Sequence, residues 1–119
     1  MGPFSPGKMV IQEGHGTFGY SSGQLGMCWE TKKLIADEAA PQADQAIKNL
    51  QALAEENGFK LEDAVKTLVF LTDMADQAAV NEVYARHFEA GKPARSCVAV
   101  HQLPAGAKFE IEAVFFKAQ

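Results

Sequence analysis

The chain has 119 residues, which suffice for one domain with a buried core but not for two. Hydrophobic residues make up 47% and the net charge at pH 7 is −4, so the composition is that of a globular protein. An acidic chain without a Lys/Arg cluster is a poor candidate for nucleic-acid binding, and no apolar run approaches the roughly 18 residues of a membrane-spanning helix.

The N-terminal part of the chain predicts a β-hairpin. Residues 8–12 and 16–23 are typical of strands, and the Gly-rich "EGHG" between them is a turn signal. The sequence "GHGTFG" (14–19) matches the dinucleotide-binding pattern G-x-G-x-x-G, but that pattern must open a helix. Because "YSSGQLG" follows instead, the hairpin is the better interpretation. Residues 26–30 predict a short extension and 31–42 a loop.

The first helix is expected to begin near Pro41, which a first helical turn accepts, and to end at Gly58. Its apolar positions recur at helical spacing. They are Ala43, Ala46, Ile47, Leu50, Leu53 and Ala54. Residues 63–73, "DAVKTLVFLTD", then carry apolar groups on both faces and predict a central, well-buried strand.

A second helix is expected after this strand, with Asp76 as its candidate N-cap and Gly91-Lys92-Pro93 ending it. Its apolar face consists of Val80, Val83, Tyr84 and Phe88. Two more strands follow, 94–101 and 108–116, joined by the turn "QLPAGA".

The order β-β-α-β-α-β-β predicts a single α+β domain over residues 1–119. We expect an antiparallel-rich mixed sheet with two helices on one face. Since strands 63–73 and 108–116 are apolar on both faces and the helices cover only one, the sheets of several subunits are expected to pack together.

Arg95 is the residue of the predicted strands for which an anionic interaction partner is most needed. Residues i and i+2 of a strand share a face, so Arg95 projects together with Cys97, Ala99 and His101. A guanidinium on an inner strand face is costly unless an anion meets it, and this anion is either a protein carboxylate or a ligand. Cys97 is either a small buried hydrophobe or a nucleophile, and no Cys-His-Asn pattern supports the nucleophile.

Glu110 and Glu112 share one strand face within "FEIEAVFF". They are either solvated residues or include an acid–base group with a perturbed pKa. Ser22-Gly23 at a strand end is either simple turn chemistry or a source of hydroxyl and N–H groups for a ligand.

The histidines His15, His87 and His101 show no metal-binding spacing and are interpreted as surface or sheet-end residues. The two cysteines form no CxxC, and the first ten residues lack the apolar core of a signal peptide. Both features predict a reducing, cytoplasmic location with free thiols.

The C-terminal run "KPARSCVAVHQLPAGAKFEIEAVFF" closely resembles the signature of the Rid (YjgF) family, the reactive-intermediate imine deaminases. Further matches are "GPFSPG" (2–7), "SSGQLGM" (21–27), "DAVKTLVFLTDM" (63–74) and "VNEVYARHF" (80–88), so the resemblance covers almost the whole chain. It implies a chorismate-mutase-like fold, a homotrimer with ligand clefts at the subunit interfaces, and no metal or organic cofactor.

The activity implied by the resemblance is hydrolysis of reactive 2-imino or enamine acids, such as 2-aminoacrylate and 2-aminocrotonate, to 2-oxo acids and ammonia. An alternative is a non-catalytic regulatory module that binds a small carboxylic acid in the same cleft. RNA cleavage is also attached to the family by name, but the acidic charge and the lack of a basic stripe argue against it.

The resemblance also assigns roles to individual residues. Arg95 matches the arginine that binds the substrate carboxylate, Cys97 lines the same pocket, and Glu110 matches the carboxylate that places or activates water.

Four further residues are implied to contact the substrate. Ser22 and Gly23 match a serine–glycine pair beside the ligand, and Asn81 matches the asparagine of the V-N-x-x-[YF] helix motif. Phe4 stands where the family usually has tyrosine, so a pocket hydroxyl is missing.

Overall fold

The computed structural model describes residues 7–12 and 15–118. The major elements follow the predicted order β-β-α-β-α-β-β, with three short strands added after the first hairpin. They are β1 (Gly7–Gln12), β2 (Gly16–Ser21), β3 (Gln24–Leu25), β4 (Met27–Cys28), β5 (Lys33–Leu34), α1 (Ala39–Glu56), β6 (Ala64–Leu71), α2 (Gln77–His87), β7 (Ala94–Ala99) and β8 (Phe109–Ala118). Short 3₁₀ turns occupy Leu61–Asp63, Met74–Asp76 and Pro104–Gly106.

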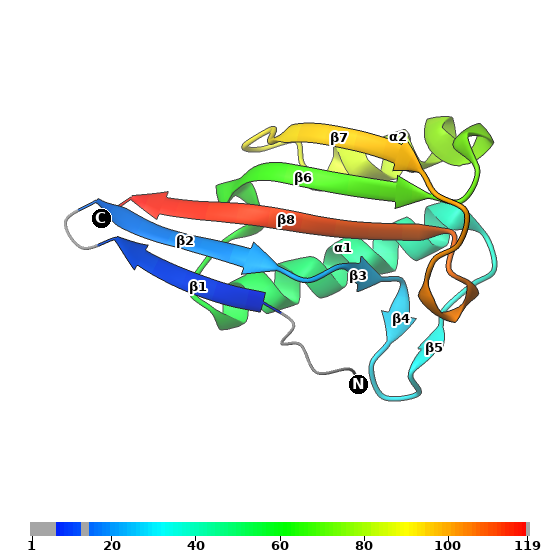
Figure 1. The fold of residues 1–119 in the computed structure, drawn as a ribbon, viewed down its shortest axis with the longest axis horizontal. Helices are drawn as coiled ribbons and strands as arrows, with labels where there is room; N and C mark the ends of the chain where they lie inside the picture. Colours follow the sequence, from blue (N-terminus) through cyan, green and yellow to red (C-terminus); the bar gives the residue numbers. More distant parts are fainter. Residues whose placement is uncertain (1–6, 13–14, 119) are drawn as a thin grey trace.

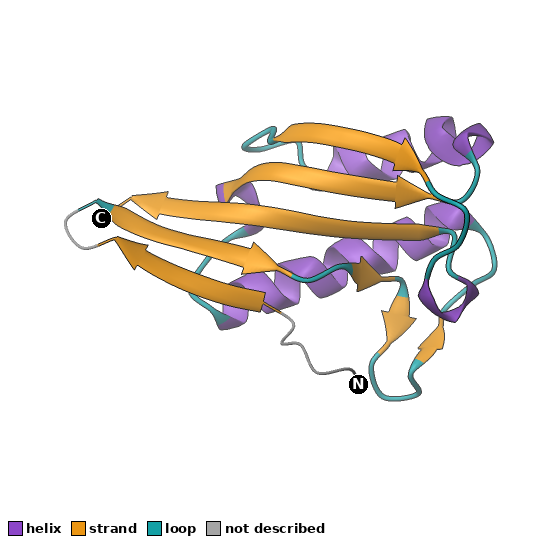
Figure 2. Cartoon of the chain, viewed as in Figure 1, coloured by secondary structure: helices purple, strands orange, loops and turns teal. Residues whose placement is uncertain are grey.

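The main sheet has the strand order β1-β2-β8-β6-β7, and β3 also pairs with β8. Its pairs are antiparallel except for β6 and β7, which run parallel and are joined through α2. Both helices lie on one face of this sheet and leave the other face uncovered (Figure 1, Figure 2). The predicted α+β architecture with a mixed sheet is confirmed.

The core lies between the helices and the covered sheet face. Along β8 the buried residues Phe109, Ile111, Ala113 and Phe115 alternate with partly exposed ones, as the period of two in a strand requires. Ile47 and Leu50 of α1 are fully buried, which agrees with the predicted apolar helix face. No helix among the described residues has the length and apolar character needed to cross a membrane.

The uncovered sheet face is apolar. Phe18 of β2 and Phe116 of β8 lie in register on this face, with ring centroids 4.8 Å apart. Val10, Tyr20 and Val98 are 41–44% exposed there. Such a face is unusual for a protein that stays monomeric. The expectation that a single chain leaves one face of its central strands uncovered therefore holds for the described residues.

Several local expectations need correction. Asp76 makes no side-chain cap at α2; instead, Asp73 Oδ1 accepts a hydrogen bond from the Ala75 N–H (2.9 Å), because a 3₁₀ turn precedes the helix. Residues 31–42 are not all loop, since they include β5 and the first turn of α1.

His87 also differs from expectation. His87 is not a surface residue, because its Nε2 lies 2.7 Å from Asp44 Oδ1 of α1 and its side chain is only 16% exposed. His101 is exposed just beyond the end of β7, which agrees with its interpretation as a sheet-end residue. Because β7 ends at Ala99, His101 is not part of the strand face that carries Arg95. Residues 16–19 of "GHGTFG" belong to β2, which confirms the hairpin.

Candidate functional site

Arg95 lies on the helix-covered side of the edge strand β7. It is in register with Thr67 of β6, whose side chain is fully buried beneath the helices. Arg95 Nη1 donates a hydrogen bond to Asn81 Oδ1 (2.8 Å), and its Cζ lies 4.8 Å from the centroid of the Tyr84 ring. Both partners are uncharged at neutral pH, so they orient the guanidinium without neutralising it.

No carboxylate of the described chain pairs with Arg95. The two ion pairs among these residues both involve Asp44, with Lys48 at 3.0 Å and His87 at 2.7 Å. Of the two partners that the sequence left open for Arg95, an internal carboxylate is therefore excluded for the described part of the chain. The positive charge remains for a ligand or another subunit.

The helix α2 presents the two groups that contact Arg95. Val80 and Val83 are buried and anchor the helix, while Asn81 and Tyr84, three residues apart, lie on a neighbouring side and reach β7. Asn81 was predicted as a site residue, and the structure places it beside Arg95. Tyr84 was interpreted only as part of an apolar helix face, although its spacing from Asn81 was a usable signal.

Cys97 shares the strand face of Arg95 and pairs in register with Val69. It is partly buried and packs against the hydrophobic core. This environment agrees with the interpretation of Cys97 as a small apolar residue.

Glu110 lies on the uncovered sheet face, between the buried residues Phe109 and Ile111 of β8. A Cβ atom added at Gly23 would lie 2.5 Å from Glu110 Oε2, so the carboxyl group packs directly against the glycine backbone. Burial raises the pKa of Glu110, and the nearby carboxylate of Glu112 raises it further. Such a carboxyl holds its proton to a higher pH than usual, which suits a general acid.

The segment around Gly23 is fixed to β8 on both sides. Before it, Ser21 Oγ accepts a hydrogen bond from the Ala113 N–H (2.9 Å). After it, Gln24 pairs with Ile111, and its side chain donates to the carbonyl of Ser22 (3.2 Å). The Ser22-Gly23 pair therefore lies beside Glu110.

The Arg95 and Glu110 clusters lie on opposite faces of the sheet. Arg95 of β7 is in register with Thr67 of β6, which in turn is in register with Ala113 of β8. Ala113 is three positions from Glu110 along β8, and β8 is two strands away from β7. This corresponds to about 10 Å along the strands and about 10 Å across them, or roughly 14 Å between the two Cα atoms. One small acid cannot contact both side chains in a single subunit.

The predicted site residues thus fall into two groups. Arg95, Asn81 and Cys97 share the covered face at the β7 edge, and Glu110, Ser22 and Gly23 gather at the β3 end of the uncovered face. Phe4 lies outside the described residues. In the described part of the chain, no group of three or more His, Cys, Asp or Glu side chains is arranged to hold a metal.

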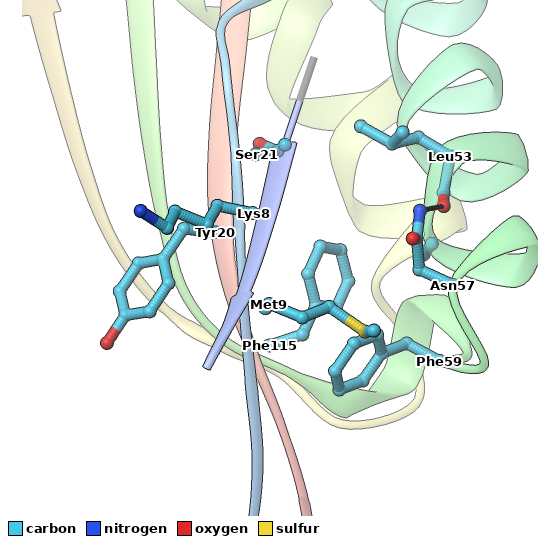
Figure 3. Close-up of a pocket in the computed structure, with 11 residues that line it drawn as sticks. Lys8, Met9, Tyr20, Ser21, Leu53, Asn57, Phe59 and Phe115 are labelled. Carbon is cyan, nitrogen blue, oxygen red and sulfur yellow. Dashed lines mark hydrogen bonds between the residues drawn. The ribbon is translucent and has the colours of Figure 1, made fainter. Parts of the chain in front are cut away.

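A small cavity between β1 and the C-terminal end of α1 is a separate feature (Figure 3). Leu53, Asn57, Phe59 and Phe115 contribute to its lining, and its volume of about 30 Å³ has room for about two water molecules. It lies near the sheet edge opposite β7 and contains none of the predicted site residues.

Comparison with known proteins identifies the family. The family model described as Endoribonuclease L-PSP matches residues 1–116. The RutC family protein y4sK of Sinorhizobium fredii is 44% identical over 114 residues, which cover 96% of this chain and 86% of that protein. The human protein named 2-iminobutanoate/2-iminopropanoate deaminase is 38% identical over 114 residues, covering 96% of this chain and 80% of the human one.

Solved structures agree with these relatives. A putative endoribonuclease of Thermotoga maritima superposes with a TM-score of 0.89 at 39% identity, over 98% of this chain and 88% of that one. Escherichia coli TdcF, solved with bound serine, has a TM-score of 0.83 at 35% identity, over 98% and 90%. With a sequence match over nearly its whole length and the same fold, the chain belongs to the Rid (YjgF) family.

Proposed function

We propose that the chain is an imine deaminase that hydrolyses small 2-imino or enamine acids to 2-oxo acids and ammonia. The observation that carries this proposal is the guanidinium of Arg95, which is held by Asn81 and Tyr84 and has no carboxylate partner in the described chain. The name of the human relative, 2-iminobutanoate/2-iminopropanoate deaminase, supports the same activity. The bound serine of TdcF is a small molecule with a carboxylate of the required kind.

In the proposed mechanism, Arg95 binds the substrate carboxylate in bidentate fashion and fixes the position of the imine carbon. Water adds to this carbon while the imine nitrogen takes up a proton, which gives a tetrahedral aminoalcohol. Its amino group then takes up a proton and its hydroxyl group gives one up, so that the C–N bond breaks, ammonia leaves, and the hydroxyl oxygen becomes the carbonyl oxygen of the 2-oxo acid. The raised pKa of Glu110 suits it to hand the proton to the nitrogen, and the resulting carboxylate can orient the water.

The proposed enzyme is a homotrimer whose sites are shared between neighbouring subunits. The apolar uncovered face supports assembly, and the positions of Arg95 and Glu110 on opposite faces favour a site to which two chains contribute. Arg95 of one subunit would then act with Glu110 and Gly23 of its neighbour.

A non-catalytic carboxylate-binding module is the weaker candidate. Such a module needs the Arg95 cluster but has no use for a carboxyl group held toward its protonated form at Glu110. RNA cleavage is disfavoured by the net charge of −4.

Ammonia release from freshly generated 2-aminocrotonate, with and without the protein, tests the activity. A subunit-mixing experiment tests the shared site. Arg95→Ala and Glu110→Gln chains, each expected to have strongly reduced activity at low substrate concentration, are refolded together in equal amounts. About one interface in four then contains both native side chains and regains activity.

Two outcomes would contradict the proposed assembly. The first is a mixture that stays as inactive as its parents although mixed trimers form. The second is sedimentation equilibrium at micromolar concentration that gives the monomer mass of 12.9 kDa.

A further inference from the structure

Tyr84 contacts two groups that lie side by side on neighbouring strands. Its hydroxyl lies 2.7 Å from Thr67 Oγ1 of β6, and its ring lies beneath the Arg95 guanidinium of β7 at 4.8 Å. Thr67 and Arg95 are directly opposite each other in the parallel β6–β7 pair. Through the Tyr84 side chain, α2 therefore contacts both β6 and β7.

Thr67 places a hydroxyl group at a central strand position. Its side chain is fully buried on the face that carries the hydrophobic core. A hydroxyl there costs free energy unless it is hydrogen-bonded, and Tyr84 supplies the bond. Valine would fill nearly the same volume without a polar atom, so the observed pair fixes the phenol at one point rather than merely filling space.

The fixed position of Tyr84 restricts the conformations that the Arg95 side chain can adopt. An arginine side chain has large rotamer freedom, which a ligand must otherwise restrict when it binds. A guanidinium held over an aromatic face keeps its N–H donors at its edge, where they can meet a planar carboxylate. Asn81 engages Nη1 and so limits rotation within that plane.

We propose that Tyr84, held by Thr67, is a positioning residue that orients the Arg95 guanidinium for the substrate carboxylate. This inference rests on the proposed function, because it assigns Arg95 the carboxylate. Tyr84 acts through Arg95 and does not itself take part in the proton transfers.

The test compares Tyr84→Leu with Tyr84→Phe and Thr67→Val with Thr67→Ser, using calorimetric binding of 2-oxobutyrate to the full-length protein. Tyr84→Leu removes the ring and is expected to weaken binding about tenfold. Tyr84→Phe keeps the ring but loses the hydroxyl that Thr67 holds, so it is expected to weaken binding about threefold, as Thr67→Val does. Thr67→Val removes the hydrogen-bond partner of the Tyr84 hydroxyl and is expected to weaken binding about threefold. Thr67→Ser keeps a hydroxyl at this position and is expected to bind with the wild-type affinity.

A double-mutant cycle separates positioning from a general effect on the fold. In an Arg95→Ala background, Tyr84→Leu is expected to cause no further loss of 2-oxobutyrate affinity, because Tyr84 acts only through Arg95. Equal losses with and without Arg95 would overturn the inference, as would wild-type affinity in Tyr84→Leu.

The same samples, assayed for ammonia release, distinguish this inference from the proposed function. Tyr84-dependent binding without any ammonia release would refute the deaminase and support the inference. Ammonia release that needs Arg95 but not Tyr84 would support the deaminase and refute the inference about Tyr84. A wild-type protein that fails to bind 2-oxobutyrate would overturn both.

Discussion

The two half-buried charged groups of the site, Arg95 and Glu110, have opposite surroundings. Arg95 contacts an amide and an aromatic ring, which orient its charge and leave it uncompensated. Glu110 lies against the Gly23 backbone with Glu112 nearby, and both burial and the second carboxylate favour its neutral form. In the proposed mechanism, the cation binds the substrate carboxylate and the carboxyl group donates a proton.

In the proposed mechanism, substrate binding and proton transfer are therefore separated in space. The cation lies on the helix-covered face and the carboxyl group on the uncovered face. Changes at Arg95 should therefore appear mainly in substrate affinity, and changes at Glu110 mainly in turnover. A substitution at either residue that changed substrate affinity and turnover to the same extent would contradict this separation of roles.

The largest effect is expected for Glu110→Gln. The amide keeps the size of the side chain but cannot transfer a proton, so kcat for 2-aminocrotonate should fall about 10²- to 10⁴-fold. The affinity for 2-oxobutyrate should stay near the wild-type value, because Arg95 is unchanged. Ammonia release and calorimetry measure the two quantities.

The exposed helix residue Glu55 provides the matched control, and Glu55→Gln should leave both quantities unchanged. Wild-type turnover in Glu110→Gln would exclude Glu110 as the acid.

Arg95→Ala should weaken 2-oxobutyrate binding at least ten- to a hundredfold, since a bidentate charged pair is lost. Arg95→Lys should restore little, because an ammonium lacks the two-pronged donor geometry. The melting temperature should change little, as no carboxylate of the described chain pairs with Arg95. Calorimetry beside a thermal melt makes both measurements.

Arg86, an exposed arginine in the last turn of α2, is the control for general charge effects. An Arg95→Ala protein that melts early yet binds the oxo acid normally would show that Arg95 is structural.

Gly23→Ala should lower kcat about tenfold, less than removal of the carboxyl group. The added Cβ would lie 2.5 Å from Glu110 Oε2, so the flexible end of the glutamate must move while the fold survives. In a Glu110→Gln background the same substitution should cause almost no further loss of turnover. Additive losses would mean that Gly23 acts independently of Glu110.

Glu112→Gln tests the electrostatic part of the Glu110 environment. Burial, the larger cause of the raised pKa, remains, but the repulsion from Glu112 disappears. The pKa of Glu110 should therefore fall, and the basic limb of the pH–rate profile should move to lower pH. An unchanged basic limb would show that Glu110 is not the group that sets it.

Protein stability should report the same pKa shift. Because the folded chain holds the Glu110 proton more tightly than the unfolded chain, the free energy of unfolding should decrease as pH rises from the ordinary glutamate pKa through the raised one. Glu112→Gln should reduce this decrease.

The fold could be predicted from the sequence because each element carried a local signal. The periodic apolar face of α1 and the two-sided apolar character of β6 determine where these elements pack. The 3₁₀ turn before α2 and the burial of His87 could not be predicted, since both depend on contacts between distant segments, such as His87 with Asp44.

The sequence suggests the candidate site residues but not their arrangement. The period of two placed Glu110 and Glu112 on one face, and the structure agrees. Nothing local reveals that Arg95 and Glu110 face opposite ways, because this depends on the register of β7, β6 and β8. Tyr84 was missed for a similar reason: an aromatic residue on an apolar helix face looks like core until its hydroxyl partner, Thr67, is known.

The smallest effect is expected for Cys97. If water is the nucleophile, Cys97→Ala and Cys97→Ser should both retain kcat within about threefold, with a modest loss of stability from the weakened contact with the core. Thiol-modifying reagents alone cannot make this test, because Cys28 is also free and hydrogen bonds from the backbone of Thr31 and Glu30 lower its pKa, which favours reaction there first. The measurement therefore belongs in a Cys28→Ala background, with mass spectrometry of the protein during turnover. A covalent adduct on Cys97, together with loss of activity in both Cys97 variants, would replace water with the thiolate as the nucleophile and leave Glu110 with proton transfer alone.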